Sequence, residues 1–243
     1  MRVALNTEWS VPREPDDQRP VPYLLRADRV GRASIALLPS SDAVVAFTAN
    51  ADGRSTVALP PHSSVVVLND VVAVWSLAPH WVKAMLGPPA ALRGTVLRAS
   101  DHPALRLFDE RDDRSALALL HDLRASLTVT PDEHEFERTW WAHRHEGQPL
   151  PTADRRVQRL MLRFAGQSLT QISTAERLAA TLRADRQSGR YNALGLYADG
   201  SHYARVCRRL TGRTPAEWRN VSLPFYGGEA GSPYRGGEAE TAH

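Results

Sequence analysis

The stretch that decides the fold is ADGSHYARVCRRLTGRTPAEWR, residues 198–219. Apolar residues recur in it at steps of three and four, which predicts a helix with one buried stripe: Tyr203, Val206, Cys207 and Leu210. Gly212 follows the stripe, where a left-handed residue ends a helix at low cost. Thr214, Pro215 and Glu217 then fit the N-cap, first position and capping-box partner of a second helix. Two short helices are expected, with arginines facing solvent.

The same pattern occurs once before, at an offset of 46 residues, in RRVQRLMLRFAGQSLTQ, residues 155–171. Gly166 aligns with Gly212, and Ser168 and Gln171 align with the later capping box. Residues 168–186 keep helical spacing, which predicts a long helix that holds the two copies tens of ångströms apart. Because one turn of B-DNA is about 34 Å, the two arginine-bearing helices could enter successive major grooves. Solvated surface helices would show the same local pattern.

The two copies, the helix between them and the closing residues 211–219 resemble the DNA-binding domain of AraC/XylS-type transcriptional regulators. In that family the second recognition helix begins near Asp-Gln-Ser-His-Phe-x-Arg, where this chain has DGSHYAR, residues 199–205. The first recognition helix typically carries Leu-Gln-Arg, which here is VQR, residues 157–159. The resemblance covers residues 132–220 and implies a sequence-specific transcriptional regulator.

Groove chemistry assigns roles to the side chains of the two recognition helices. Arginine can pair with guanine and glutamine with adenine, so Arg155, Gln158 and Arg159 are expected to face base edges. Ser201, His202 and Arg205 are their counterparts in the second helix. The arginines expected at phosphates are Arg163, Arg208, Arg209 and Arg213. The predicted DNA-binding residues are Arg155, Arg156, Gln158, Arg159, Arg163, Ser201, His202, Arg205, Arg208 and Arg209. The resemblance implies double-stranded DNA and RNA polymerase as partners.

The N-terminal half has a different pattern. Short β-branched runs separated by turn residues predict a small antiparallel sheet or open barrel, with strands at 33–38, 43–48, 56–59, 64–68 and 71–77. Proline-rich residues 1–32 are expected to be irregular after a short start at 2–6. Residues 74–97 resemble the sensor half of some AraC-type regulators, which implies a small-molecule effector or a homodimer contact. Further helices are predicted at 78–86, 103–109, 115–127 and 130–146.

The sequence therefore predicts an α+β protein with a sensor-like domain over 1–128, a tandem helix-turn-helix domain over 131–220 and a disordered tail over 221–243. The charge is divided accordingly, because residues 151–220 hold 13 arginines against five acidic residues, whereas residues 1–150 have a net charge of −3. Because of this excess of arginine, we expect residues 151–220 to bind a polyanionic partner. A single cysteine and no long apolar run predict a cytoplasmic protein that does not cross a membrane.

The sequence has few features of an enzyme or of a metal-binding protein. His134, His143 and His145 crowd one predicted helix, but no His-Glu-x-x-His spacing occurs, which argues against a zinc site. Neither a phosphate-binding glycine loop nor a Gly-x-Ser-x-Gly elbow is present. Cys207 lies on the apolar stripe, which favours a buried side chain over a reactive thiol. We predict no catalytic residue, no metal and no cofactor.

Departures from the family pattern leave a second interpretation open. Family members place a full helix before each recognition helix, but residues 147–152 are short and proline-rich, and residues 191–197 fall about one turn short. Gly200 also stands where relatives often have glutamine. The alternative is a degenerate relative that acts as a protein-interaction module without specific DNA binding.

Overall fold

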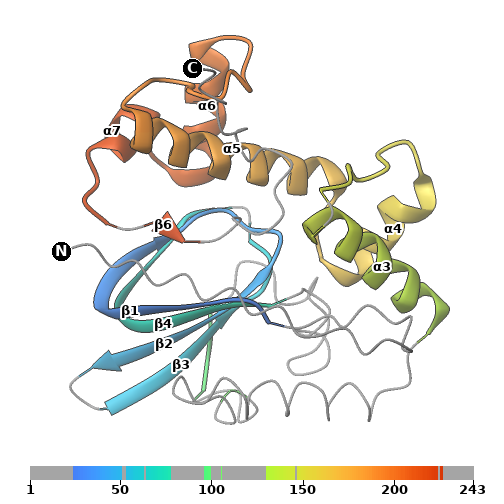
Figure 1. Cartoon of the computed structure of the whole chain (residues 1–243), viewed down its shortest axis with the longest axis horizontal. Helices are drawn as coiled ribbons and strands as arrows, with labels where there is room; N and C mark the ends of the chain where they lie inside the picture. The colour runs from blue at the N-terminus through green and yellow to red at the C-terminus, as the bar shows by residue number, and fades with distance from the viewer. Residues whose placement is uncertain are drawn as a thin grey trace, which may run out of the picture.

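The computed structural model describes residues 24–50, 53–62, 64–77, 96–99, 105, 130–145, 147–223 and 225–226. The strands are β1 (Leu24–Leu37), β2 (Ala43–Asn50), β3 (Gly53–Leu59), β4 (Val66–Leu77), β5 (Leu97–Arg98) and β6 (Phe225–Tyr226). The helices are α3 (Pro131–His145), α4 (Arg155–Phe164), α5 (Leu169–Ser188), α6 (Gly200–Thr211) and α7 (Pro215–Arg219). Figure 1 shows the sheet below α5, with α3 and α4 beside it.

The strands form one sheet in the order β5-β3-β2-β4-β1-β6. All pairs are antiparallel except β1 with β6, in which Ala36 and Leu37 pair with Phe225 and Tyr226. The predicted α+β class and the antiparallel N-terminal sheet are thereby confirmed. They follow from short β-branched runs, whose side chains pack well on a pleated surface.

The structure corrects the predicted division at Asn69 and Asp70. These residues do not form a turn, because β4 runs through them as a single strand. Asp70 adopts a left-handed backbone with φ 55°, and the register against β1 shifts nearby. Arg32 in β1 is also left-handed, and its Nε donates to Asp70 Oδ1 at 3.1 Å. Asp70 therefore lies at a bulge in β4. An aspartate can adopt the left-handed conformation in a bulge as readily as in a turn.

A second correction concerns the start of the sheet. Residues 24–32 were predicted to be irregular, yet β1 begins at Leu24 and pairs with β4 from there. Charged and polar residues in this segment weaken its alternation, so pairing with an apolar neighbouring strand decides its conformation.

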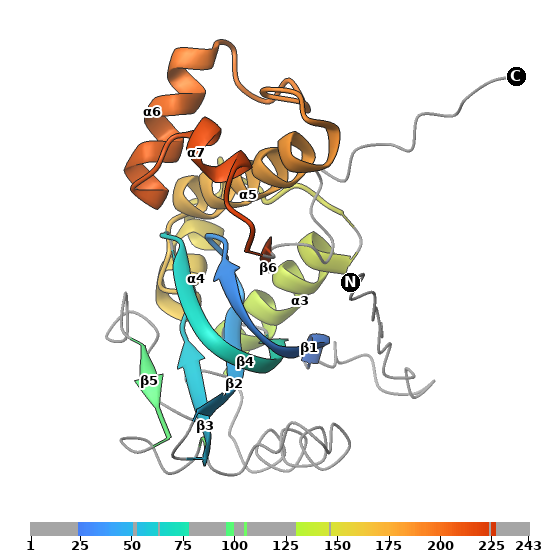
Figure 2. The ribbon, with the colours of Figure 1, turned by 90° about the vertical axis from the view of Figure 1, so that its left-hand side faces the viewer.

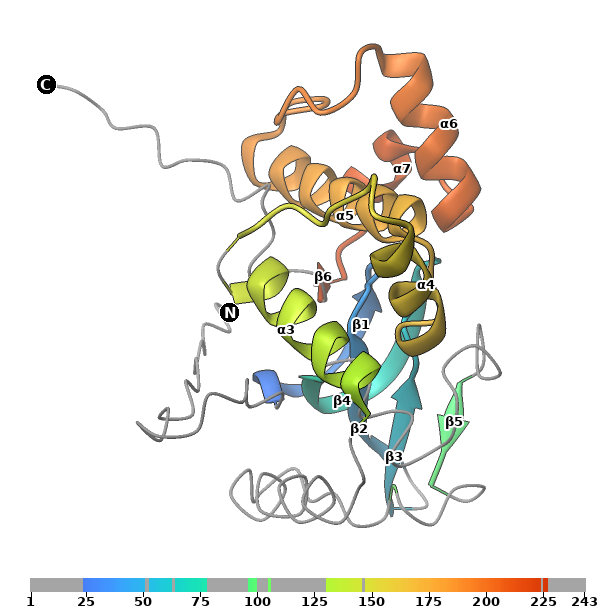
Figure 3. The same ribbon diagram turned by 90° about the vertical axis from the view of Figure 1, so that its right-hand side faces the viewer.

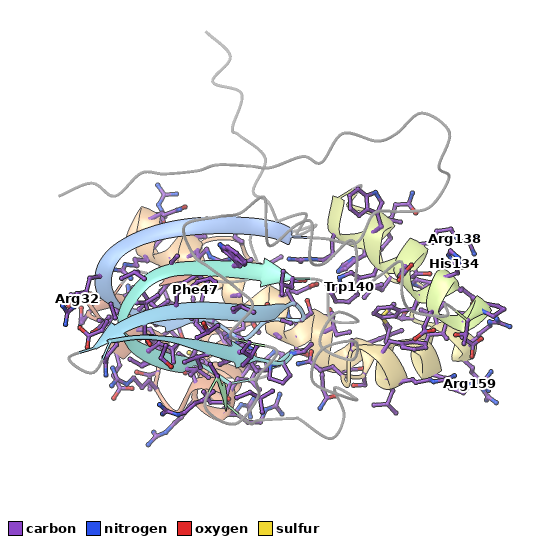
Figure 4. The ribbon with its side chains drawn as sticks, turned by 90° about the horizontal axis from the view of Figure 1, so that it is seen from below. Arg32, Phe47, His134, Arg138, Trp140 and Arg159 are labelled. Atoms are coloured by element: carbon purple, nitrogen blue, oxygen red, sulfur yellow. The ribbon has the colours of Figure 1, made fainter. Side chains whose placement is uncertain are left out.

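Both faces of the central strand β2 are buried. Ala43, Val45 and Phe47 share a cluster with residues of α3 and α4, whereas Val44 and Ala46 belong to a cluster on the opposite face. This double burial explains why β2 is a continuous apolar run instead of an alternating one. Figure 4 shows Trp140 of α3 pointing toward the sheet, while His134 and Arg138 lie on the outer side of that helix.

Helix ends follow the predicted capping chemistry. The capping boxes of Ser168 with Gln171 and of Thr214 with Glu217 are both formed. Thr130 makes the same reciprocal bonds with Glu133 at the start of α3. These side chains satisfy backbone donors that the first helical turn leaves unpaired.

The sheet and the helical region share their hydrophobic interior. One cluster joins β2, β3 and β4 to α3, α4 and the start of α5, and another joins Ala36 and Leu38 to α5, α6 and α7. Trp218 of α7 packs edge-on against Phe225 of β6, and the Arg186 guanidinium lies over the Phe225 ring. The predicted disordered tail therefore begins with residues that the structure places against β1. Figures 2 and 3 show α5 and α7 above this end of the sheet.

Several sequence-based predictions lie outside the described residues. They are the start at 2–6, the helices at 78–86, 103–109 and 115–127, the end of the sensor-like domain at 128, and the tail from 227 to 243.

A buried histidine gives the sheet a testable dependence on pH. His62 is 5% exposed and pairs through its backbone with Ser40, and its Nδ1 lies 3.2 Å from the Pro60 carbonyl oxygen. Because a carbonyl only accepts, Nδ1 carries the proton of a neutral ring. Burial lowers the pKa of His62 to about 4. Between pH 6.5 and 4 the unfolded chain therefore takes up a proton that the folded chain refuses, so stability is lost as pH falls.

We expect the free energy of unfolding of the wild type to decrease relative to that of His62→Gln by about 2 kcal/mol between pH 7.5 and pH 5. Urea unfolding of both proteins at the two pH values measures this difference. Comparison with the variant is needed because burial raises the pKa of Asp42 to about 6, which acts in the opposite direction over the same range. A difference between the two proteins that does not change with pH would contradict the prediction.

Candidate nucleic-acid interface

Helices α4 and α6 are structurally equivalent at the predicted offset of 46 residues. Equivalent positions face the interior in both helices; in chain order they are Val157, Leu160, Met161 and Phe164 in α4 and Tyr203, Val206, Cys207 and Leu210 in α6. Gly166 and Gly212 both adopt left-handed conformations, with φ of 70° and 73°. The repeated sequence pattern is therefore a repeated structure.

Each of the two helices begins with an aspartate N-cap. Asp154 accepts from the backbone N–H groups of Arg156 and Val157, and Asp199 accepts from that of His202 at 2.6 Å. The hydrogen bond from the His202 backbone lowers the pKa of Asp199. The two caps fix the direction in which each helix leaves its preceding loop.

The outward face of each helix carries exposed side chains at matching positions. Arg155, Arg159 and Leu162 line this face of α4, and Ser201, Arg205 and Arg208 line it in α6. Figure 1 shows α4 and α6 toward opposite ends of α5, and Figures 2 and 3 show both on the same side of the molecule. The two helices that carry the predicted residues thus lie on one side of the molecule.

Leu162 is the outward residue that the sequence analysis missed. Its side chain is 49% exposed at the position that aligns with Arg208. The 46-residue alignment held the signal, because a leucine stands there where the other copy has an exposed arginine.

Some predicted DNA-binding residues are already engaged within the protein. Arg156 donates through Nε to Glu135 at 2.7 Å and contacts Asp132 at 3.3 Å. Arg163 donates to the same Asp132 at 3.0 Å, and Gln158 donates to the Thr152 carbonyl. Arg156 and Arg163 therefore point toward α3, on the flank of the outward face.

A cavity of about 220 Å³ opens on that flank. Its lining residues come from the first turn of α3 and from one side of α4: Asp132, Arg156, Arg159, Leu160 and Arg163. Figure 4 shows Arg159 pointing outward at the edge of this region.

The acidic residues of segment 151–220 all serve internal roles. Asp154 and Asp199 cap helices, Glu217 completes a capping box, and Glu176 and Asp185 are buried. The arginines, in contrast, are largely exposed: Arg155, Arg156, Arg159, Arg163, Arg190, Arg205, Arg208, Arg209 and Arg213. The positive charge of this segment is therefore displayed to solvent, while its negative charge is used in the fold.

No helix precedes α4 or α6 within residues 147–154 and 189–199, which the structure describes in full. Two complete helix-turn-helix units are therefore not formed there, in line with the shortness of these segments. A polar and aromatic arrangement supports α6 instead. Asp185 accepts from the Tyr203 hydroxyl and from the Ala193 backbone N–H, both at 2.8 Å, and the Tyr197 ring stacks on Tyr203.

The same arrangement explains Gly200, where relatives often have glutamine. The Tyr191 hydroxyl donates to the Gly200 carbonyl at 2.8 Å. A Cβ atom at Gly200 would lie 3.0 Å from Cε1 of the Tyr191 ring. A side chain here would require Tyr191 to move, so the glycine follows from local packing.

A buried ionic network fixes α3 and α5 to the sheet. Arg144 is fully buried and donates to Asp42 at 2.5 Å and to Glu176 at 3.2 Å. Ser41 and His143 also bind Glu176, at 2.8 and 3.0 Å. Burial alone would raise the pKa of Glu176, but the hydrogen bond from His143 and the charge of Arg144 hold it below its ordinary value. These residues were not predicted as a group, since they come from separate parts of the chain.

Cys207 is buried, as predicted from its place on the apolar stripe. Burial raises the pKa of its thiol to about 11. A thiol with this pKa is almost wholly protonated at neutral pH. In the described part of the chain, no group of His, Cys, Asp and Glu side chains is arranged to hold a metal ion.

Family models, curated proteins and solved structures give no match to the chain. Of the helices that the structure describes, none is both long enough and apolar enough to cross a bilayer.

Proposed function

We propose that the chain is a sequence-specific transcriptional regulator of the AraC type that binds double-stranded DNA through α4 and α6. The observation that carries this proposal is the equivalence of the two helices. Each has an aspartate cap, a buried stripe at identical positions and an outward face with arginines, and both lie on the same side of the molecule. Two such helices separated by α5 suit two successive major grooves.

Contacts to bases come from the outward faces in this proposal. Arg155 and Gln158 of α4 and Ser201, His202 and Arg205 of α6 address base edges, and Leu162 adds an apolar contact of the kind that thymine methyl groups accept. Arg208, Arg209 and Arg213 contact phosphates. The N-terminal sheet modulates binding through a small ligand or a second copy of the chain, and the shared core and the Arg144 network provide its connection to α3 and α5.

Selection of bound duplexes from a random pool by the purified chain tests the function directly. We expect a motif with two blocks about one helical turn apart, and binding that weakens steeply between two salt concentrations. Salt-sensitive binding without a motif would contradict sequence-specific recognition, and no binding by a folded chain would remove the DNA proposal altogether.

Two substitutions on α6 separate base recognition from phosphate binding. Arg205→Ala is expected to reduce discrimination at one position of the selected motif by roughly 5- to 150-fold, because a bidentate arginine–guanine contact contributes about 1–3 kcal/mol. Arg209→Ala is expected to weaken the motif and a scrambled duplex alike. Arg190→Ala, an exposed arginine outside both helices, is the control. Equal effects of Arg205→Ala on both duplexes would contradict the assignment.

The alternative is a protein-interaction module that no longer binds specific DNA. The observation that favours it is the lack of a helix in residues 147–154 and 189–199, which leaves α4 and α6 without the usual supporting helix. The selection experiment decides between the two, because the alternative predicts no motif.

A further inference from the structure

We infer that the cavity between α3 and α4 is a binding pocket for one phosphodiester group. The assignment of a DNA strand as the source of that group rests on the proposed function. The pocket itself rests on the side chains that line it, and it changes the expected role of Arg159 from base recognition to phosphate binding.

The arginines of the pocket are held in place by α3. The two carboxylate oxygens of Asp132 bridge Arg156 and Arg163, at 3.3 and 3.0 Å. Glu135 also accepts from Arg156 at 2.7 Å, and the Arg163 guanidinium lies 5.0 Å from the centre of the Phe164 ring. Asp132 therefore holds the two guanidinium groups next to each other on one side of the pocket.

Arg159 supplies the donors that the fold does not use. Within the described residues it has no hydrogen bond or ion pair, in contrast to Arg156 and Arg163 beside it. Each guanidinium has five N–H donors, so Arg156 and Arg163 also keep donors beyond those that bind α3. Leu160, which is 3% exposed, forms an apolar wall of the cavity. The three arginines that line the pocket therefore keep N–H donors that no bond to α3 uses.

The charge of the pocket selects the class of anion. The lining arginines and Asp132 have a net charge of +2, and Glu135, which is paired with Arg156, reduces the net charge to +1. A phosphodiester carries one negative charge and neutralises this excess, whereas a phosphomonoester carries −1.5 to −2 at neutral pH and leaves negative charge beside Asp132. We therefore expect the pocket to prefer a diester, the form that phosphate takes in a nucleic-acid backbone.

The first test follows binding to duplex DNA. Arg159→Gln is expected to weaken the selected motif and a scrambled duplex by the same factor, and to reduce the slope of log affinity against log salt by about 0.9, the value for one phosphate contact. Asp132→Asn removes a competing charge and is expected to tighten binding to both duplexes. Arg190→Gln is the matched control. Loss of preference for the motif alone in Arg159→Gln would return Arg159 to a base and overturn the inference.

The second test does not depend on DNA. Dimethyl phosphate and inorganic phosphate are titrated against the full chain at constant ionic strength, and the Nε–H signals of the arginines are followed by NMR. Dimethyl phosphate is expected to shift the signals of Arg156, Arg159 and Arg163 at lower concentration than inorganic phosphate, and Asp132→Asn is expected to reverse this order. No shift, or a preference of the wild type for the dianion, overturns the pocket. Shifts in a chain that binds no duplex would refute the proposed function and leave the pocket intact.

Discussion

Replacement of Arg144 with methionine is expected to lower the free energy of unfolding by about 3–5 kcal/mol at neutral pH. Arg144 is fully buried and holds the carboxylates of Asp42 and Glu176, which are themselves buried. Methionine can fill much of the volume, but it leaves two carboxylates without their cation. The loss arises from these unpaired charges, since their desolvation is no longer offset.

Urea unfolding of the variant measures this loss, with Arg138→Met as the matched control. Arg138 is an exposed arginine on the same helix, so its replacement is expected to change stability by less than about 0.5 kcal/mol. Asp42→Asn added to Arg144→Met is expected to recover part of the loss, because it removes one of the unpaired charges. Additive effects of the two substitutions would show that the network does not act as a unit.

Replacement of Asp185 with alanine is expected to cost about 3 kcal/mol, and to do so locally at α6. Asp185 is fully buried and accepts from the Tyr203 hydroxyl and the Ala193 N–H, and each hydrogen bond to a charged group contributes about 1.5–3 kcal/mol. Burial and the hydrogen bond to Asp185 raise the pKa of Tyr203, so its hydroxyl stays protonated and donates. Without Asp185, both donors lose their partner and the loop before α6 loses its anchor.

Hydrogen exchange distinguishes this local effect from general destabilisation. Amide protection in α6 is expected to fall more in Asp185→Ala than protection in α4, which has no contact with Asp185. Tyr203→Phe removes one of the two hydrogen bonds and is expected to show a smaller effect in the same place. An equal loss of protection in α4 and α6 would contradict the role given to Asp185.

Helix positions were predictable from the sequence because their determinants are local. Thr214 with Glu217 and Ser168 with Gln171 satisfy backbone donors three residues away, and Gly212 ends a helix by its own backbone preference. The buried stripes of α4 and α6 were also predictable, since a period of 3.6 residues places them on one face. The shortness of the segments before α4 and α6 was likewise visible in the sequence, from the prolines in residues 147–152 and from the length of residues 191–197.

The sheet was less predictable at positions where the same local conformation occurs in two kinds of structure, such as a turn and a bulge. Asp70 can form a turn or a bulge, and only its pairing with β1 and the contact with Arg32 decided for the bulge. Phe225 lay in a glycine-rich sequence, but packing against Trp218 and Arg186 places it in β6. Contacts between residues distant in sequence therefore determine both the bulge at Asp70 and the position of Phe225 in β6.

The sequence by itself determined the α+β class, the repeated helices, their caps and the excess of arginine in residues 151–220. Only the tertiary structure decided which of those arginines are paired within the protein and which stay unpaired. The reason is that the direction of a side chain depends on what packs beside its helix. Asp132 and Glu135 turn Arg156 and Arg163 toward α3 and leave Arg159 unpaired beside them. Tertiary packing likewise joins Asp42, Arg144 and Glu176, since a buried charge is tolerated only where the fold supplies its partner.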